Sequence, residues 1–212
     1  EVDGGWVRAG VRTMEVGASA SDRYRVLGRA GALGQLHRLA LVGFDKPATC
    51  AGILEEALEW VERPLQRLEL RVCFLNAEAA ALMLGAPACQ KLEALSLRSS
   101  YKPSATNLLA SSSRLGSVRQ LELGGDLLRA EDLILLCEAP LFEGLERLQV
   151  GGLLDARGES AEPVVYAVCE ALNQSPQVER LGLTSFELTP DGARAVARSR
   201  WAPGLRVLEL PG

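Results

Sequence analysis

The stretch Leu65-Gln66-Arg67-Leu68-Glu69-Leu70 is a six-residue phrase with large apolar side chains at its first, fourth and sixth positions. The phrase occurs eight times, with Leu, Val or Met at the apolar positions, and it begins at residues 11, 36, 65, 92, 118, 145, 178 and 205. Successive phrases start 25 to 33 residues apart. A period of this length is typical of repeat proteins, in which each unit buries its apolar side chains only against its neighbours.

Each phrase predicts a short β-strand, because side chains alternate between the two sides of an extended chain. Between the phrases, apolar residues recur at helical spacing. The expected helices span residues 50–61, 77–84, 105–110, 130–137, 163–172 and 190–200. The residues expected to cap helix starts are Thr49, Asn76, Ser104 and Thr189. Strands that alternate with helices pair in parallel through right-handed crossovers, so the sequence predicts an α/β fold.

The stretch Leu65-x-x-Leu68-x-Leu70-x-x-Cys73-x-Leu75 resembles the leucine-rich repeat family. The last helix and phrase, residues 188–197 and 203–210, resemble its ribonuclease-inhibitor-like subclass, and more closely the short-repeat bacterial members. The resemblance implies a curved, right-handed solenoid of about eight repeats, with parallel strands on the concave side and helices on the convex side. It also suggests a recognition or regulatory arm of a larger cytosolic protein.

Two features depart from the family pattern. Family members usually carry Asn or Cys eight residues after the first Leu, where this chain has only one full match. The residues at these positions are Ser19, Phe44, Cys73, Ser100, Asp126, Leu153 and Phe186. The 33-residue step after Leu145 places an insertion at 151–160, which is either a tolerated surface insertion or a loop that contacts a partner.

Composition narrows the class of protein. We expect residues 1–212 to form a single domain, and since the sequence shows no polar cap at either end, we expect a fragment of a longer chain. A net charge of −4 argues against nucleic-acid binding, and no apolar run approaches the roughly 18 residues that span a bilayer. Five cysteines without CxxC spacing favour a reduced, cytoplasmic location.

The third and fifth residues of each phrase point away from the predicted core. The third positions are richer in Arg and the fifth positions richer in Glu, so an Arg row lies beside a Glu row. These charges either form solvated pairs on an exposed sheet or dock a protein, with Arg forks that contact carboxylates. Tyr101, in the turn after one strand, is the best exposed aromatic anchor. The candidate protein-binding residues are Arg38, Arg67, Glu69, Tyr101, Glu122, Arg147 and Arg180.

The sequence offers little for catalysis, and we predict no catalytic, cofactor or metal site. His37 is the only histidine, so neither a two-histidine metal motif nor a good Ser/His/Asp set is present. Cys137 and Cys169 occupy comparable helix positions and are expected to be small core residues. No phosphate-binding motif accompanies the glycine pairs that follow two of the strands.

We therefore expect a non-catalytic interaction domain or scaffold, which binds another protein or another domain of its own polypeptide. One alternative is a segment that recruits substrate to an enzyme whose catalytic domain lies outside residues 1–212. Another is a structural spacer that forms homo-oligomers by stacking its uncapped ends.

Overall fold

The computed structural model describes residues 12–17, 28, 31, 33–44, 46–101, 103–128, 130–153, 162–173, 177–184 and 188–210. Within these ranges, the side chains of 47, 48, 99–101, 103, 125–128, 130, 152 and 153 are not described. The expected start of the first phrase at Val11 and most of the 151–160 insertion lie outside the described residues.

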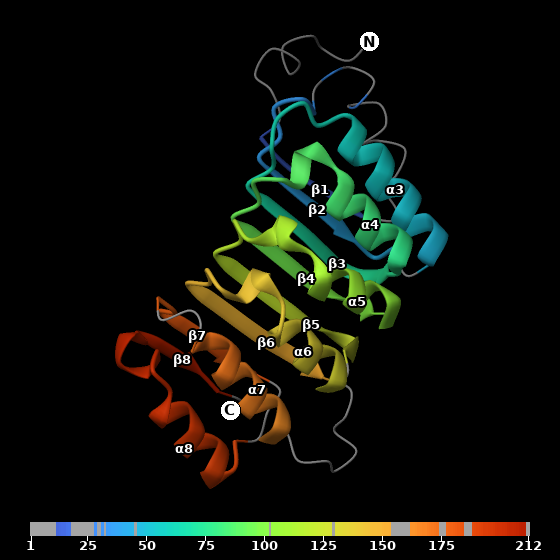
Figure 1. Ribbon diagram of the computed structural model, residues 1–212. Coiled ribbons are helices and arrows are strands. Elements are labelled where there is room, and N and C mark those ends of the chain that lie inside the picture. Colours follow the sequence, from blue (N-terminus) through green and yellow to red (C-terminus); the bar gives the residue numbers. More distant parts are fainter. Residues whose placement is uncertain are drawn as a thin grey trace.

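The described residues form one sheet of eight parallel strands, whose order in space is their order in sequence (Figure 1). The strands are β1 (Thr13–Gly17), β2 (Arg38–Val42), β3 (Arg67–Leu75), β4 (Ala94–Tyr101), β5 (Gln120–Leu128), β6 (Arg147–Leu153), β7 (Arg180–Leu183) and β8 (Val207–Glu209). Every strand begins at the third residue of a phrase, and third positions pair with third positions across the whole sheet. The predicted α/β fold and its strand repeat are confirmed.

A repeated backbone contact fixes this register. The carbonyl oxygen of the second residue in one phrase accepts hydrogen bonds from the second and third N–H groups of the next. Thus His37 O accepts from Gln66 N at 2.8 Å and from Arg67 N at 3.0 Å, and the same pair of bonds recurs at every step. A one-residue slip would break these bonds and expose every core side chain, so the pattern strongly specifies the register.

The core consists of the apolar phrase positions. The first, fourth and sixth residues of the phrases that begin at 36, 65, 92, 118, 145 and 178 are all at most 2% exposed. Enclosing each such side chain contributes roughly 1.5–3 kcal/mol. The last phrase differs, because Leu208 and Leu210 are 41% and 44% exposed on the edge strand β8. On the other edge strand, β1, the corresponding Met14 and Val16 are 9% and 1% exposed, so the loss of burial is confined to the β8 edge.

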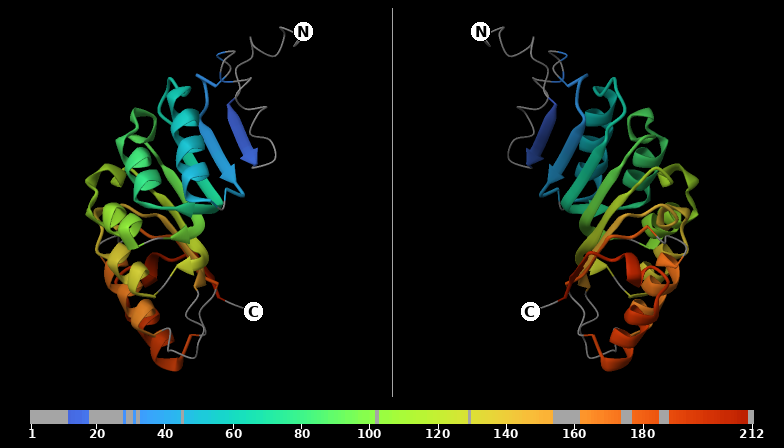
Figure 2. Two further views of the ribbon diagram at one scale, coloured as in Figure 1. Left: turned by 90° about the vertical axis from the view of Figure 1, so that its right-hand side faces the viewer. Right: turned by 90° about the vertical axis from the view of Figure 1, so that its left-hand side faces the viewer.

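Six α-helices of the described chain cover one face of the sheet: α3 (Pro47–Glu59), α4 (Ala77–Gly85), α5 (Pro103–Ser111), α6 (Ala130–Cys137), α7 (Glu162–Leu172) and α8 (Pro190–Arg198). They lie along the outer side of an arc, with the strands on its inner side (Figure 2). Short 3-10 helices lead back toward four of the strands: η2 (Pro87–Cys89), η3 (Ser113–Leu115), η4 (Pro140–Phe142) and η5 (Ala202–Gly204).

The structure confirms two of the four predicted helix caps. Asn76 Oδ1 accepts from Ala79 N at 2.9 Å and Thr189 Oγ1 accepts from Gly192 N at 3.1 Å, so both caps are confirmed. The caps at Thr49 and Ser104 were wrong, because α3 and α5 each begin earlier, at a proline. Proline suits the first turn of a helix, where its missing N–H has no helical partner.

The irregular second half of β3 carries the one full match to the family's conserved Asn or Cys position. The Cys73 thiol is buried and donates to the Leu41 carbonyl of the preceding repeat at 3.3 Å. Just before it, Val72 has a φ of 54° and a side chain that is 66% exposed. This left-handed conformation is costly for a β-branched residue. It accompanies an irregularity in the pairing of β3 with β4 between Arg71 and Phe74.

Candidate functional site

The face of the sheet opposite the helices, here called the open face, carries no helix in the described part of the chain (Figure 2). Residues at the third and fifth positions of each phrase lie on this face, as predicted from strand alternation. Their burial differs from the prediction at several fifth positions. Ala40, Glu69 and Ser96 are at most 4% exposed, although they lie on the face away from the helices.

Glu69 is the centre of an ion-pair cluster on this face. Its Oε1 lies 2.5 Å from Arg38 Nη2 on β2 and accepts a 2.6 Å hydrogen bond from Arg67 Nε on its own strand. Its Oε2 lies 3.4 Å from Arg71 Nε. We predicted Glu69 as a partner contact, but its side chain is only 5% exposed, against 44% for Arg38 and 37% for Arg67. Glu69 therefore holds the arginines in place, and the arginines face solvent.

The pKa of Glu69 reflects this environment. Burial by itself raises the pKa, since it disfavours the charged form. The hydrogen bonds and positive charges of Arg67 and Arg38 act in the opposite direction and outweigh burial, so the pKa lies below its ordinary value. Glu69 is thus a buried carboxylate that stays ionised at neutral pH.

Two further arginines of the open face escaped the sequence analysis. Arg71 and Arg98 are register partners on β3 and β4, at the seventh residue of their phrases. Arg71 Nη2 lies 2.5 Å from the Glu15 carboxylate on β1, and Arg98 Nε lies 3.4 Å from the Glu122 carboxylate on β5. Since these strands extend beyond the six-residue phrase, continuing the alternation by two residues would have found both arginines.

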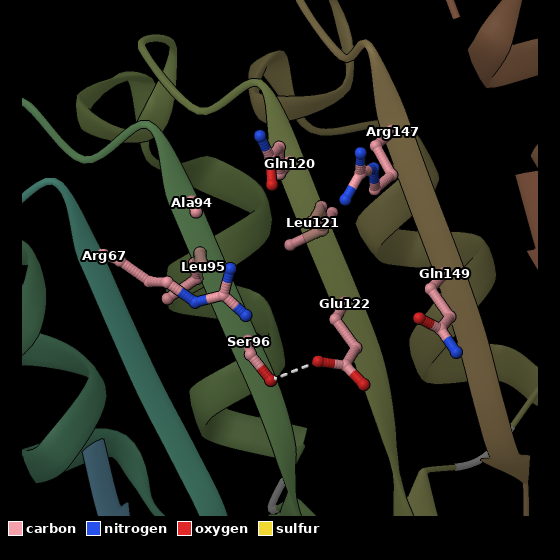
Figure 3. A pocket seen from close by; sticks show the side chains of 9 residues that line it. All are labelled: Arg67, Ala94, Leu95, Ser96, Gln120, Leu121, Glu122, Arg147 and Gln149. Atoms are coloured by element: carbon pink, nitrogen blue, oxygen red, sulfur yellow. Dashed lines mark hydrogen bonds between the residues drawn. The ribbon is translucent and has the colours of Figure 1, made fainter. Parts of the chain in front are cut away.

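A hollow of about 80 Å³ opens in the middle of the face (Figure 3). Ala94 lies between Arg67 and Gln120 in the register, and its short side chain leaves this space. Arg67 and Arg147 reach over the hollow from its two sides. The Ser96 hydroxyl donates to Glu122 Oε2 at 2.7 Å at its lower end. The hollow thus offers cations, a carboxylate and an apolar floor within one short span.

The structure brings most of the predicted residues to one surface. Arg38, Arg67, Glu122, Arg147 and Arg180 all lie on the open face, on strands β2, β3, β5, β6 and β7. Tyr101 ends β4, and its side chain lies outside the described part of the structure.

The cysteine side chains match a structural role in the core. All five cysteines are free and buried, so the prediction that Cys137 and Cys169 are core residues is confirmed. Within the described ranges, no three His, Cys, Asp or Glu side chains are grouped to hold a metal ion. Over the same ranges, no helix has the length and hydrophobicity needed to cross a membrane.

No protein-family model matches this chain, and no curated protein matches it either.

Proposed function

We propose that this chain is a leucine-rich repeat solenoid of the ribonuclease-inhibitor-like kind, and that it is a non-catalytic domain that binds another protein through its open face. Arginines on neighbouring strands of this face, held in place by Glu69, are the observation that carries the proposal. The core positions repeat almost unchanged, whereas the open-face positions differ from strand to strand, so specificity resides there. Preorganised side chains bind more tightly, because little freedom is lost on association.

The type of side chain also fits protein recognition. Arginine is enriched in the residues that dominate protein interfaces, and its planar fork makes paired hydrogen bonds to carboxylates. The overall charge of the chain is negative, which disfavours a nucleic acid as the partner. The proposed partner is a protein, or another domain of the same polypeptide, with acidic residues at the contact surface.

The experiment begins with isolation of the partner by co-purification from the native cell. Its affinity is then measured for the wild type and for a variant with Arg38, Arg67, Arg147 and Arg180 replaced by Ser. We expect at least a thirtyfold loss of affinity, which is about 2 kcal/mol, because a minority of interface residues, with arginine enriched among them, each cost more than about 1 kcal/mol when truncated. Unchanged binding by a folded variant would contradict the proposal.

Two further variants complete the experiment. The charge-matched control replaces Arg63, Lys91, Arg198 and Arg200, which are exposed residues outside the strands, and it should bind like the wild type. Ala94→Tyr fills the hollow while keeping Glu69 and all four arginines in the sequence. It should weaken binding even if the fourfold arginine variant fails to fold.

A second candidate function is self-association through β8. Its support is the exposure of Leu208 and Leu210, whose counterparts in earlier repeats are buried. Molar mass measured by light scattering over a hundredfold range of concentration tests this candidate. A mass that rises with concentration, and no longer rises in Leu208→Ser/Leu210→Ser, would support it; a constant monomer mass would exclude it.

A further inference from the structure

We propose that Arg147 and Arg180 form a carboxylate-binding subsite on the open face, which takes an aspartate or glutamate side chain of the partner. The inference rests on the proposed function, because it names the chemical group that the surface receives. It comes from comparing two places in the sheet where arginines occupy neighbouring strands at the same phrase position.

The first place is the Glu69 cluster, which serves as an internal template. Arg38 and Arg67 are register partners at the third position of adjacent strands. The fifth residue of the second strand, Glu69, contacts both guanidinium groups, at 2.5 and 2.6 Å. Like charges on adjacent strands repel each other, and a carboxylate between them removes that repulsion. The chain thus shows how its own sheet neutralises two neighbouring arginines.

The second place repeats this arrangement without the carboxylate. Arg147 and Arg180 are also register partners at the third position, on β6 and β7. The residue that corresponds to Glu69 is Gly182, which has no side chain. Both arginines are exposed, and neither forms an ion pair with any carboxylate in the described part of the chain. A carboxylate of another molecule can therefore bind between the two guanidinium groups, as Glu69 does in the template, once the exposed Glu209 side chain beside Gly182 turns away.

Three carboxylates of the chain lie near Arg147 and Arg180 and affect how strongly these arginines attract an incoming carboxylate. Glu146 and Glu179 border the small hollow beside the two arginines, and Glu179 lies 3.4 Å from Arg206 in an ion pair. Glu209 is the register partner of Gly182, and its Oε2 lies 3.5 Å from the place where a Cβ at residue 182 would be. Glu209 is exposed and pairs with neither arginine, so it repels an incoming carboxylate. Glu209→Gln should therefore increase affinity for an acidic ligand.

The test uses a fluorescein-labelled peptide of eight glutamates, with octaglutamine as the uncharged probe, and anisotropy as the readout at physiological salt. We expect saturable binding of octaglutamate only. Arg147→Ser/Arg180→Ser should weaken it at least tenfold. Arg63→Ser/Arg200→Ser, which removes the same charge from exposed sites outside the strands, should change it less than twofold.

A second variant restores the missing carboxylate while keeping both arginines. Gly182→Glu is combined with Gln149→Ser, because a Cβ at residue 182 would lie 3.1 Å from Gln149 Cγ. This double variant should also bind octaglutamate at least tenfold more weakly than the wild type. Gln149→Ser alone should have an affinity for octaglutamate within threefold of the wild type. Absence of octaglutamate binding, or equal binding by wild type and both subsite variants, would overturn the inference.

The same variants separate this inference from the proposed function. If the fourfold arginine variant loses the natural partner while Gly182→Glu/Gln149→Ser keeps it, the carboxylate subsite is wrong and the open face remains the binding surface. If neither variant changes partner affinity, both proposals fail. A tenfold or larger loss of affinity for the partner in both variants supports both proposals.

Discussion

The Glu69 carboxylate on β3 lies 2.5 Å from the Arg38 guanidinium on β2, a contact that joins the fifth position of one repeat to the third position of the preceding one. Because the same oxygen accepts from Arg67 Nε at 2.6 Å, one buried acid orders two partly exposed arginines. The open face is therefore organised by charge pairs that cross from strand to strand. The core beneath it is organised by leucines that are nearly interchangeable between repeats.

Removal of this acid should destabilise the fold to a moderate extent. Glu69→Ala leaves Arg38 and Arg67 without their shared partner, but both remain in contact with water, which limits the cost. We expect a loss of about 1–2 kcal/mol in the free energy of unfolding, measured by urea denaturation. Glu15→Ala, whose side chain is 60% exposed, is the matched control and should cost under about 0.5 kcal/mol. Equal losses in the two variants would contradict the central position of Glu69.

The contribution of Glu69 to the stability of the fold should also depend on pH. Its pKa is lowered in the folded chain, because the hydrogen bond and charges of the arginines outweigh the opposing effect of burial. The unfolded state then binds a proton at a higher pH than the folded state. The contribution is fully present above the unfolded pKa and is lost as pH falls through the folded pKa. The stability difference between wild type and Glu69→Gln should therefore shrink as the pH falls below the pKa of glutamate in the unfolded chain, and a difference that grows toward acid would refute this explanation.

The stability lost on substitution of a core leucine should depend strongly on which repeat carries it. Leu121→Asp places a carboxylate at a site that is 2% exposed, between two neighbouring repeats, and should cost at least about 4 kcal/mol or prevent folding. Leu208 occupies the same phrase position on β8 but is 41% exposed. Leu208→Asp should lower the free energy of unfolding by less than about 1.5 kcal/mol. Thermal unfolding followed by circular dichroism compares the two variants, and similar losses would argue against neighbour-dependent burial.

The irregularity of β3 at Val72 offers a stabilising substitution. Its φ of 54° is unfavourable for a β-branched side chain, and the side chain buries little, since it is 66% exposed. Asparagine tolerates this conformation, so Val72→Asn should raise stability by about 0.5–1 kcal/mol. The same change at Val42, a half-buried residue inside strand β2, should lower stability instead. A loss of stability in Val72→Asn would show that the backbone at this irregularity is not strained.

The buried thiols should react slowly in the folded protein. Burial raises the pKa of Cys89 to about 12 and is the main reason that the pKa of Cys137 is also about 12, against an ordinary value of 9.0. At pH 8 the thiolate fraction of each is then lower by about a thousandfold, and thiolate is the reactive form. A chromogenic disulfide reagent should modify these two cysteines only as fast as the chain unfolds. Rapid modification in the absence of denaturant, located by peptide mass spectrometry, would contradict their burial.

The repeat was predictable from sequence because every phrase uses the same apolar pattern. The pattern at Leu65, Leu68 and Leu70 fixes the position of a strand, its register and its buried side. Helix starts were harder to predict. A cap at Thr49 competes with the conformational preference of Pro47, and the proline determines where α3 begins.

The open face was predictable in its location but not in its details. Strand alternation places Glu69 on this face, but its burial depends on arginines that fold over it from β2 and β3. The contact with Arg38 joins residues far apart in sequence, so no local pattern reveals it. Arg71 and Arg98 were missed for a simpler reason, because the strands continue past the phrase that defined the search.

Covalent footprinting of the chain with and without its purified partner, read out by mass spectrometry at single residues, tests most directly whether the open face binds the partner. The partner should reduce labelling at Arg67, Glu122, Arg147 and Arg180 on the open face. Labelling of Tyr166, which is 47% exposed on α7, and of Leu108 on α5 should stay unchanged. Protection of these two helix residues, with undiminished labelling of the open-face residues, would contradict the central claim that the strand face binds the partner.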